Sequence, residues 1–221
     1  MTPESRRRAL LQMKAGHAPF SYAPVRTALG DILNAQPGLV VVRPTSWAAV
    51  ERKVARLARS LVEARANIDV GKLLYEYLAE QEVAALVREF EGFSLGIGQV
   101  VRYWPDAVLL VGGVPVLPCF DFRRSGGLTE VGRRFVFSIM NEKFRALSGD
   151  FAEARFVIFQ LTQEPRQSRI VRSFFADGIS LFSYDEIIQM AADTNRLWRE
   201  ILEERAEETR KTGTADSGWW G

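Results

Sequence analysis

Two aspartates, Asp106 and Asp121, lie at the outer ends of two apolar runs separated by Gly112-Gly113. A Gly-Gly pair between β-rich runs is typical of a two-residue hairpin turn, because both turn residues need positive φ. That turn fixes a register in which Asp106 lies diagonal to Asp121 on one face of the sheet. Two carboxylates so placed would hold Mg²⁺ or Mn²⁺ together with waters and phosphate oxygens. The hairpin therefore predicts a metal site at Asp106 and Asp121, with neutralisation by Arg123 on the same face as the alternative.

Composition narrows the chemistry that remains open to this chain. The 221 residues include one cysteine, Cys119, and one histidine, His17, which excludes an intramolecular disulfide, a cysteine-based zinc cluster and a histidine-rich metal site. Acid–base or metal chemistry would therefore fall to carboxylates. The net charge of +2 identifies no partner. No apolar run approaches the roughly 18 residues of a membrane span, so we expect a cytoplasmic protein without a membrane partner.

The pattern of apolar residues predicts a mixed α/β fold, in which a central mixed β-sheet is flanked by helices. The expected helices are residues 1–14, 24–35, a segment capped by Thr45 or Ser46, 68–90, 129–147 and 183–208. The expected strands are residues 39–42, 94–103, 107–111, 114–122, 156–162, 170–175 and 179–182. Because Pro115 and Pro118 interrupt the second arm of the hairpin, that arm is expected at a sheet edge or bent where it leaves the sheet. We divide the chain into an N-terminal helical region (1–67), an α/β core (68–208) and a polar, disordered tail (209–221), in which Trp219-Trp220 is unusual.

The hairpin motif resembles a known family. Pro105-Asp106, followed after fourteen residues by Asp121-Phe122-Arg123, is similar to the Pro-Asp…(Asp/Glu)-x-Lys signature of the restriction-endonuclease-like (PD-(D/E)XK) superfamily. The resemblance implies a restriction-endonuclease-like core with an N-terminal helical extension. It also implies a metal-dependent nuclease acting on nucleic acid, with DNA favoured over RNA. Glu76 on the preceding helix and Gln160 on a following strand would join the site.

The lysine of the family signature is replaced by Arg123, which stays protonated and cannot act as a base. Three readings stay open: Lys143 on the following helix takes over, metal-bound water needs no lysine, or the chain is an inactive relative. In the last case the chain would be a nucleic-acid-binding or protein-interaction subunit.

Arginines bracket the loop 125–127, whose small residues would let a phosphate approach the backbone. Arg124, Arg133 and Arg134 are therefore the predicted nucleic-acid-binding residues, although such a loop requires no ligand. A homodimer and a subunit of a larger complex are both compatible with the sequence.

Overall fold

The computed structural model describes residues 2–11, 21–35, 43–81, 83–88, 90, 93–95, 100–101, 107–124, 126–146, 151–163 and 168–212. A five-stranded sheet in the order β1-β4-β5-β6-β7 forms its centre. Its strands are β1 (Ala84–Val87), β4 (Ala107–Val111), β5 (Val114–Asp121), β6 (Arg155–Gln163) and β7 (Arg169–Phe175). Neighbouring strands are antiparallel except β5 and β6, which run parallel. Two short strands, β2 (Phe93–Ser94) and β3 (Val100–Val101), pair separately.

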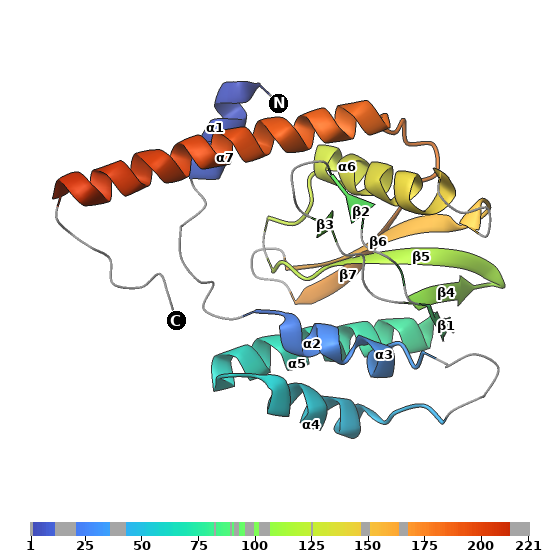
Figure 1. Cartoon of the computed structure of the whole chain (residues 1–221). Coiled ribbons are helices and arrows are strands. Elements are labelled where there is room, and N and C mark those ends of the chain that lie inside the picture. The colour runs from blue at the N-terminus through green and yellow to red at the C-terminus, as the bar shows by residue number, and fades with distance from the viewer. Residues whose placement is uncertain are drawn as a thin grey trace.

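Helices cover both faces of the sheet (Figure 1). One face carries α2 (Ala23–Thr27), α3 (Leu29–Ile32), α4 (Trp47–Leu57) and α5 (Leu61–Glu80). The other carries α6 (Glu130–Met140), which continues as a π-helix over Asn141–Ala146. Outside α6 lie the 29-residue α7 (Tyr184–Thr212) and the short α1 (Pro3–Leu11). The central mixed sheet with flanking helices confirms the predicted mixed α/β class.

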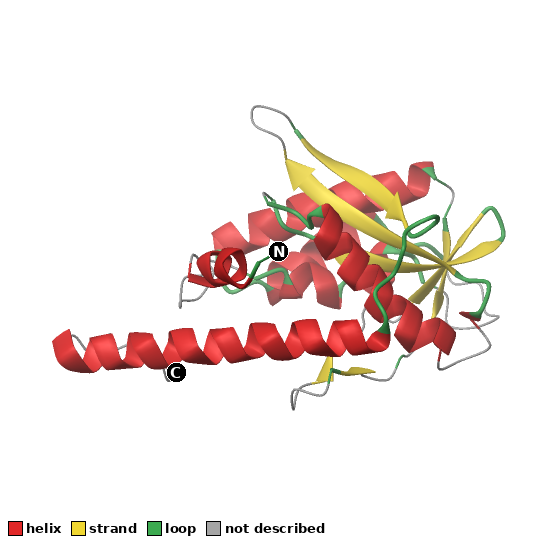
Figure 2. Ribbon diagram, turned by 90° about the horizontal axis from the view of Figure 1, so that it is seen from above, coloured by secondary structure: helices red, strands yellow, loops and turns green. Residues whose placement is uncertain are grey.

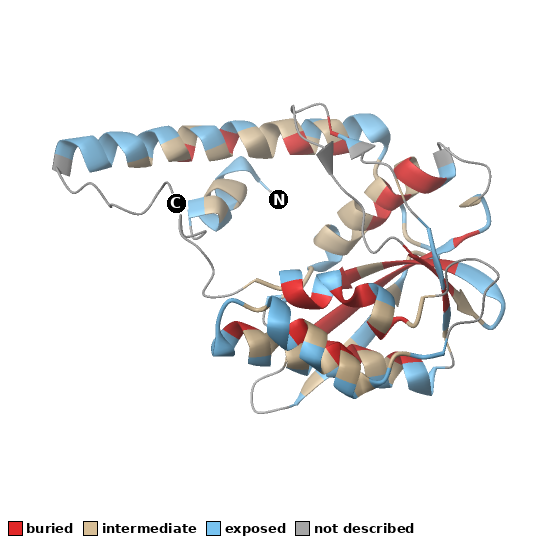
Figure 3. Ribbon diagram, turned by 60° about the horizontal axis from the view of Figure 1, so that its bottom comes forward, coloured by how far each residue is buried: buried red, intermediate tan, exposed pale blue. Residues whose placement is uncertain are grey.

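Alternation along the strands divides the core into two halves. On β5, Val116 and Phe120 pack toward α2–α5, whereas Leu117 and Cys119 pack toward α6. The residues on both sides are buried, which explains why the central strands are almost continuously apolar. Figure 3 shows this burial in the strands and in the helix faces turned toward them, whereas much of α7 is exposed. Asp121 is two residues beyond Cys119 on the same strand, so its side chain lies on the face of the sheet that α6 covers.

The predicted hairpin is confirmed. Gly112 and Gly113 both have positive φ, at 58° and 81°, and Val111 pairs with Val114 as the register requires. The prediction that the second arm is a sheet edge is wrong, because β5 lies between β4 and β6. The described pairing of β5 with β4 covers only Val114 to Val116. Pro118 lies beyond these pairs, so its missing N–H interrupts none of them.

Several predicted boundaries were wrong. The expected helix over residues 68–90 belongs to α5, which begins at Leu61 and ends at Glu80, and residues 84–87 instead form edge strand β1 against β4. The apolar spacing of this segment suits either structure, and pairing with β4 decides the outcome. Residues 179–182 lie in an irregular connection rather than a strand. Of the expected strand 94–103, the described residues place Ser94 at the end of β2 and Val100–Val101 in β3, and the remainder apart from Leu95 lies outside the described residues. The expected strand 39–42 lies outside the described residues.

A buried acidic residue attaches the N-terminal helices to α5. Glu63 accepts hydrogen bonds from the backbone N–H groups of Ser21 and Arg59, at 2.9 and 2.6 Å, and from the Arg59 guanidinium at 3.2 Å. One turn later, Asn67 Oδ1 accepts the Val25 N–H at 3.0 Å. These contacts satisfy donors at the starts of α2 and α5, where no intrahelical acceptor exists. The proposed division at residue 67 falls inside α5 and stays a prediction.

The outermost layer consists of α7 and α1. At 1.5 Å per residue α7 is about 43 Å long, and Figure 2 shows it running past the rest of the molecule. Ion pairs join α7 to α1: Arg7 Nη2 lies 2.5 Å from the Glu204 carboxylate, and Arg6 Nη1 lies 3.7 Å from that of Asp193. In the described parts of the chain, no helix is both long and apolar enough to cross a membrane.

Candidate functional site

Asp121 ends β5 with a carboxylate that is only 7% exposed. Its Oδ1 accepts hydrogen bonds from the Arg123 N–H at 3.2 Å and from Arg123 Nε at 2.7 Å. Its Oδ2 accepts from Arg123 Nη2 and from the Leu128 N–H, both at 2.8 Å. Both oxygens are thus occupied by donors of the chain itself. The carboxylate closes the loop that leads from β5 into α6.

The opposite charges of Asp121 and Arg123 each favour the ionised form of the other side chain. Burial by itself raises the pKa of Asp121, but the hydrogen bonds from Arg123 and Leu128 and the Arg123 charge outweigh it, so the pKa lies below its ordinary value. The hydrogen bond to Asp121 raises the pKa of Arg123. Burial also raises the pKa of the neighbouring Cys119 thiol to about 12. Near neutral pH the site therefore holds an ionised carboxylate, a guanidinium and a neutral thiol.

The parallel pairing of β5 with β6 brings a second predicted residue to this site. Gln160 lies directly beside Asp121 in the register and is 8% exposed. Its side chain packs under Gly127, so closely that a Cβ at position 127 would lie 1.8 Å from Gln160 Nε2. The Gln160 Oε1 atom is buried without a hydrogen-bond partner in the described structure. Glycine at 127 is therefore a packing requirement of the loop over Gln160.

The structure does not bring Glu76 to this group. Glu76 is on α5, which covers the opposite face of the sheet from α6, and its side chain is 56% exposed and 3.8 Å from Lys72. Lys143 lies on the α6 side, in the π-helix, and is buried with its ammonium 5.5 Å from the centre of the Phe144 ring. Asp106 lies outside the described residues, so the predicted diagonal placement against Asp121 stays a prediction.

The three arginines predicted to grip nucleic acid are engaged within the chain. Arg124 Nε donates to Gln163 at 2.5 Å. The guanidinium of Arg133 lies 4.0 Å from the centre of the Phe174 ring, and that of Arg134 lies 3.7 Å from the Phe182 ring. Contacts of this kind are cation–π interactions that stabilise the fold.

The predicted Mg²⁺ or Mn²⁺ site needs ligands that the described residues do not gather. Among those residues no group of three or more His, Cys, Asp or Glu side chains is placed to hold a metal ion. At Asp121 the Arg123 guanidinium lies where a cation would bind, which was the alternative foreseen from the sequence. Because Asp106 lies outside the described residues, the metal site stays a prediction.

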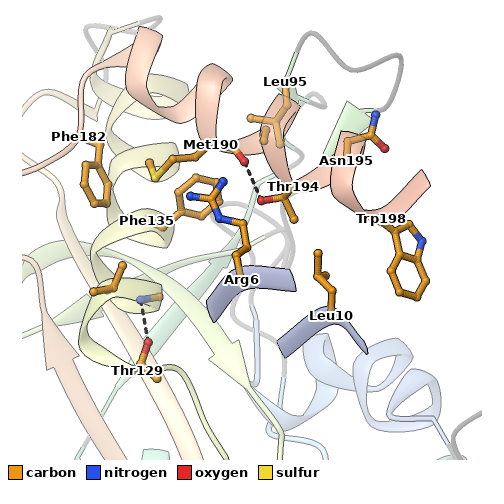
Figure 4. A pocket seen from close by; sticks show the side chains of 13 residues that line it. Arg6, Leu10, Leu95, Thr129, Phe135, Phe182, Met190, Thr194, Asn195 and Trp198 are labelled. Atoms are coloured by element: carbon orange, nitrogen blue, oxygen red, sulfur yellow. Dashed lines mark hydrogen bonds between the residues drawn. The ribbon is translucent and has the colours of Figure 1, made fainter. Parts of the chain in front are cut away.

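A second region, which sequence reasoning missed, is an apolar cavity of about 900 Å³ between α1, α6 and α7. Its main apolar lining residues are Leu10, Leu95, Phe135, Phe182, Met190 and Trp198. They come from four separate parts of the chain and converge as Figure 4 shows. The spacing of Met190, Ala191, Thr194 and Trp198 along α7 was the available signal, because it places them on one helical face. Cavities of this size and character are typical binding sites.

Comparisons with known proteins give these two regions a context. Fold and site together describe a mixed-sheet α/β protein with an internally neutralised acidic site and an apolar recess. The model of the SocB family, described as sliding clamp-binding bacterial toxin SocB, matches residues 1–208. The chain is also 41% identical over 221 residues to the DNA replication inhibitor toxin SocB of Caulobacter vibrioides (strain NA1000 / CB15N). That alignment covers all of this chain and 93% of the relative. The chain therefore belongs to the SocB family.

One solved structure, the crystal structure of SSO0001, covers 89% of this chain at 14% identity, with 86% of its own length covered. The TM-score of 0.32 is too low to support an argument about fold or function.

Family membership corrects four predictions. The resemblance to the PD-(D/E)XK superfamily was wrong, because the family that matches residues 1–208 is one of clamp-binding toxins. The restriction-endonuclease-like identity of the core falls with it. The metal-dependent nuclease, and nucleic acid as the direct partner, are corrected on the same ground. The physical reason is the degeneracy of the signature: an acid two residues before a cation at the end of a strand also arises as a structural ion pair, as Asp121 and Arg123 do here.

Proposed function

We propose that this chain inhibits DNA replication by binding a sliding clamp, without chemistry of its own. The observation that carries the proposal is the match to a family of sliding clamp-binding toxins over residues 1–208. The 41% identity to a DNA replication inhibitor toxin across the whole chain supports it. Bacterial DNA is replicated in the cytoplasm, so we expect the protein to act there.

The contacts at Asp121 support a binding role. A nuclease would need this carboxylate available to a metal ion, whereas here its oxygens hold Arg123 and the Leu128 N–H. The same contacts order the loop that starts α6. The predicted alternative, a protein-interaction role for a chain without catalysis, is therefore the one we adopt.

Direct binding tests the proposal. The purified chain is titrated with the sliding clamp of its own host by isothermal calorimetry, and we expect saturable binding with a defined stoichiometry. Asp121→Asn is the matched variant: it keeps the shape of the side chain but removes the charge that a metal would need, so binding should persist. A folded chain that shows no saturable binding up to about 100 μM, or a binding free energy weaker than about 5.5 kcal/mol, would overturn the proposal.

A further inference from the structure

The cavity between α1, α6 and α7 combines apolar walls with a cation. Leu10 of α1, Phe135 of α6 and Trp198 of α7 contribute to the walls. Arg6 of α1 reaches into the middle of the group (Figure 4). A volume of about 900 Å³ lies within the range of small-molecule sites, which are mostly apolar with a few polar groups that orient the ligand. The cavity therefore has the size and composition of a site for a small amphipathic molecule.

Arg6 has donors that the surrounding side chains leave open. Its side chain is 22% exposed, and in the described part of the chain no hydrogen bond engages its guanidinium. The carboxylate of Asp193 lies 3.7 Å from Arg6 Nη1, which is beyond hydrogen-bonding distance. That carboxylate already accepts a hydrogen bond from Gln189 Nε2 at 3.1 Å, and Arg196 lies 3.8 Å from it. A mostly buried guanidinium with open donors favours an anionic ligand.

The walls of the cavity extend along α7. Met190, Thr194 and Trp198 all line it, and the eight residues from Met190 to Trp198 span about 12 Å of helix. Thr194 donates its hydroxyl hydrogen to the Met190 carbonyl at 2.7 Å, so its methyl group is the part left to contact a ligand. A thioether side chain adapts its shape to what it contacts. An extended apolar recess of this kind suits a flexible alkyl chain.

We propose that this cavity binds a fatty-acid-like monocarboxylate, with the carboxylate on Arg6 and the alkyl chain along α7. The planar guanidinium matches a carboxylate, which can accept two parallel hydrogen bonds from it. The chain would pack between Phe135 and Trp198, where it removes apolar surface from water. A neutral head group would lose the charge-assisted hydrogen bonds, and a cationic one would be repelled by Arg6.

Calorimetric titration of the full chain tests this proposal with three ligands that share one ten-carbon tail. Decanoate carries an anionic head group, decan-1-ol a neutral one and decyltrimethylammonium a cationic one, and each is used below the concentration at which it forms micelles. We expect decanoate to bind saturably, with one molecule per chain. Its affinity should exceed that of decan-1-ol by about tenfold or more, because its hydrogen bonds to Arg6 are charge-assisted. Decyltrimethylammonium should not bind.

Two pairs of variants locate the ligand. Arg6→Gln should weaken decanoate binding about tenfold and leave that of decan-1-ol unchanged. Arg8→Gln removes the same charge from an exposed position of α1 and should change neither. Asn195→Trp places an indole among the lining residues and should abolish binding of both ligands. Ala206→Trp adds the same side chain at an exposed position of α7 and should have no effect.

The proposal is overturned if decanoate shows no saturable binding, or if decan-1-ol or decyltrimethylammonium binds as tightly. Equal weakening by Arg6→Gln and Arg8→Gln would show that only the net charge attracts the ligand. Unchanged binding in Asn195→Trp would place the ligand outside the cavity. The titrations contain no clamp, so their failure is distinct from failure of the proposed function.

Discussion

The end of strand β5 and the cavity beneath α7 differ in how their functional groups are engaged. At β5, Asp121 is surrounded by donors of its own chain, and each carboxylate oxygen already accepts hydrogen bonds. In the cavity, apolar groups such as Phe135 and Trp198 converge on open space. The first region resembles a catalytic motif in sequence, but in the structure its carboxylate is hydrogen-bonded to Arg123 and to the Leu128 N–H. The second has no motif in the sequence, yet the fold forms an apolar recess there, so a motif alone did not locate the open site of this molecule.

The largest expected effect on stability comes from removing the Asp121 carboxylate, which accepts hydrogen bonds only from its own chain in the described structure. Asp121→Ala removes the acceptor for Arg123 and for the Leu128 N–H in a mostly buried position, and should lower the free energy of unfolding by about 2–3 kcal/mol. Chemical denaturation measures the change. Asp121→Asn keeps one acceptor and should cost less. Equal stability of Asp121→Ala and the wild type would show that the contacts at β5 contribute nothing to folding.

The second-largest effect on stability is expected where the loop at Gly127 packs over Gln160. Gly127→Ala places a Cβ against the buried Gln160 amide and should cost about 2 kcal/mol through overpacking. Gly30→Ala is the control, because nothing lies within 4 Å of its Cβ position and alanine favours the helix. A combined Gly127→Ala/Gln160→Ala variant should lose less than the sum of the two single changes. Additive losses would contradict the direct contact.

Acid should weaken the attachment of the N-terminal helices. The hydrogen bonds from Arg59 and Ser21 lower the pKa of Glu63 to about 2 from its ordinary 4.5. A lowered folded-state pKa means that the ionised form stabilises the fold above pH 4.5, and that this contribution is lost as the pH falls from 4.5 toward 2. Glu63→Gln should therefore flatten the dependence of stability on pH in this window. The free energy of unfolding is measured by urea denaturation at several pH values between 5 and 2. An equally steep dependence of this free energy on pH in Glu63→Gln and in the wild type would rule this out.

The smallest effect is expected where α1 meets α7. Arg7→Gln removes an exposed ion pair with Glu204, so the unfolding midpoint should hardly change. Hydrogen exchange of the α1 amides should nevertheless become faster, because α1 depends on α7 for its contacts. Arg8→Gln, at an exposed position of the same helix, is the control. Equal exchange in the two variants would show that the ion pair does not hold α1 beside the cavity.

The sequence predicted what depends on local chemistry. Gly112-Gly113 predicted the hairpin and its register, and alternation predicted that Cys119 and Asp121 share a face. The pairing of Asp121 with Gln160 depends on a parallel crossover that no local signal reveals, although both residues were selected. Glu76 was assigned to the site because distance along the chain does not tell which face of a sheet a helix covers. The cavity was missed because its residues come from α1, α6, α7 and the segment around Leu95, which only the tertiary fold brings together.

The central claim, replication inhibition through a clamp, is tested most directly by primer extension with a reconstituted replicative polymerase. We predict that the chain inhibits extension only when the reaction depends on a loaded sliding clamp, and that Asp121→Asn inhibits as strongly as the wild type. Equal inhibition with and without the clamp, or template cleavage that Asp121→Asn abolishes, would contradict the account.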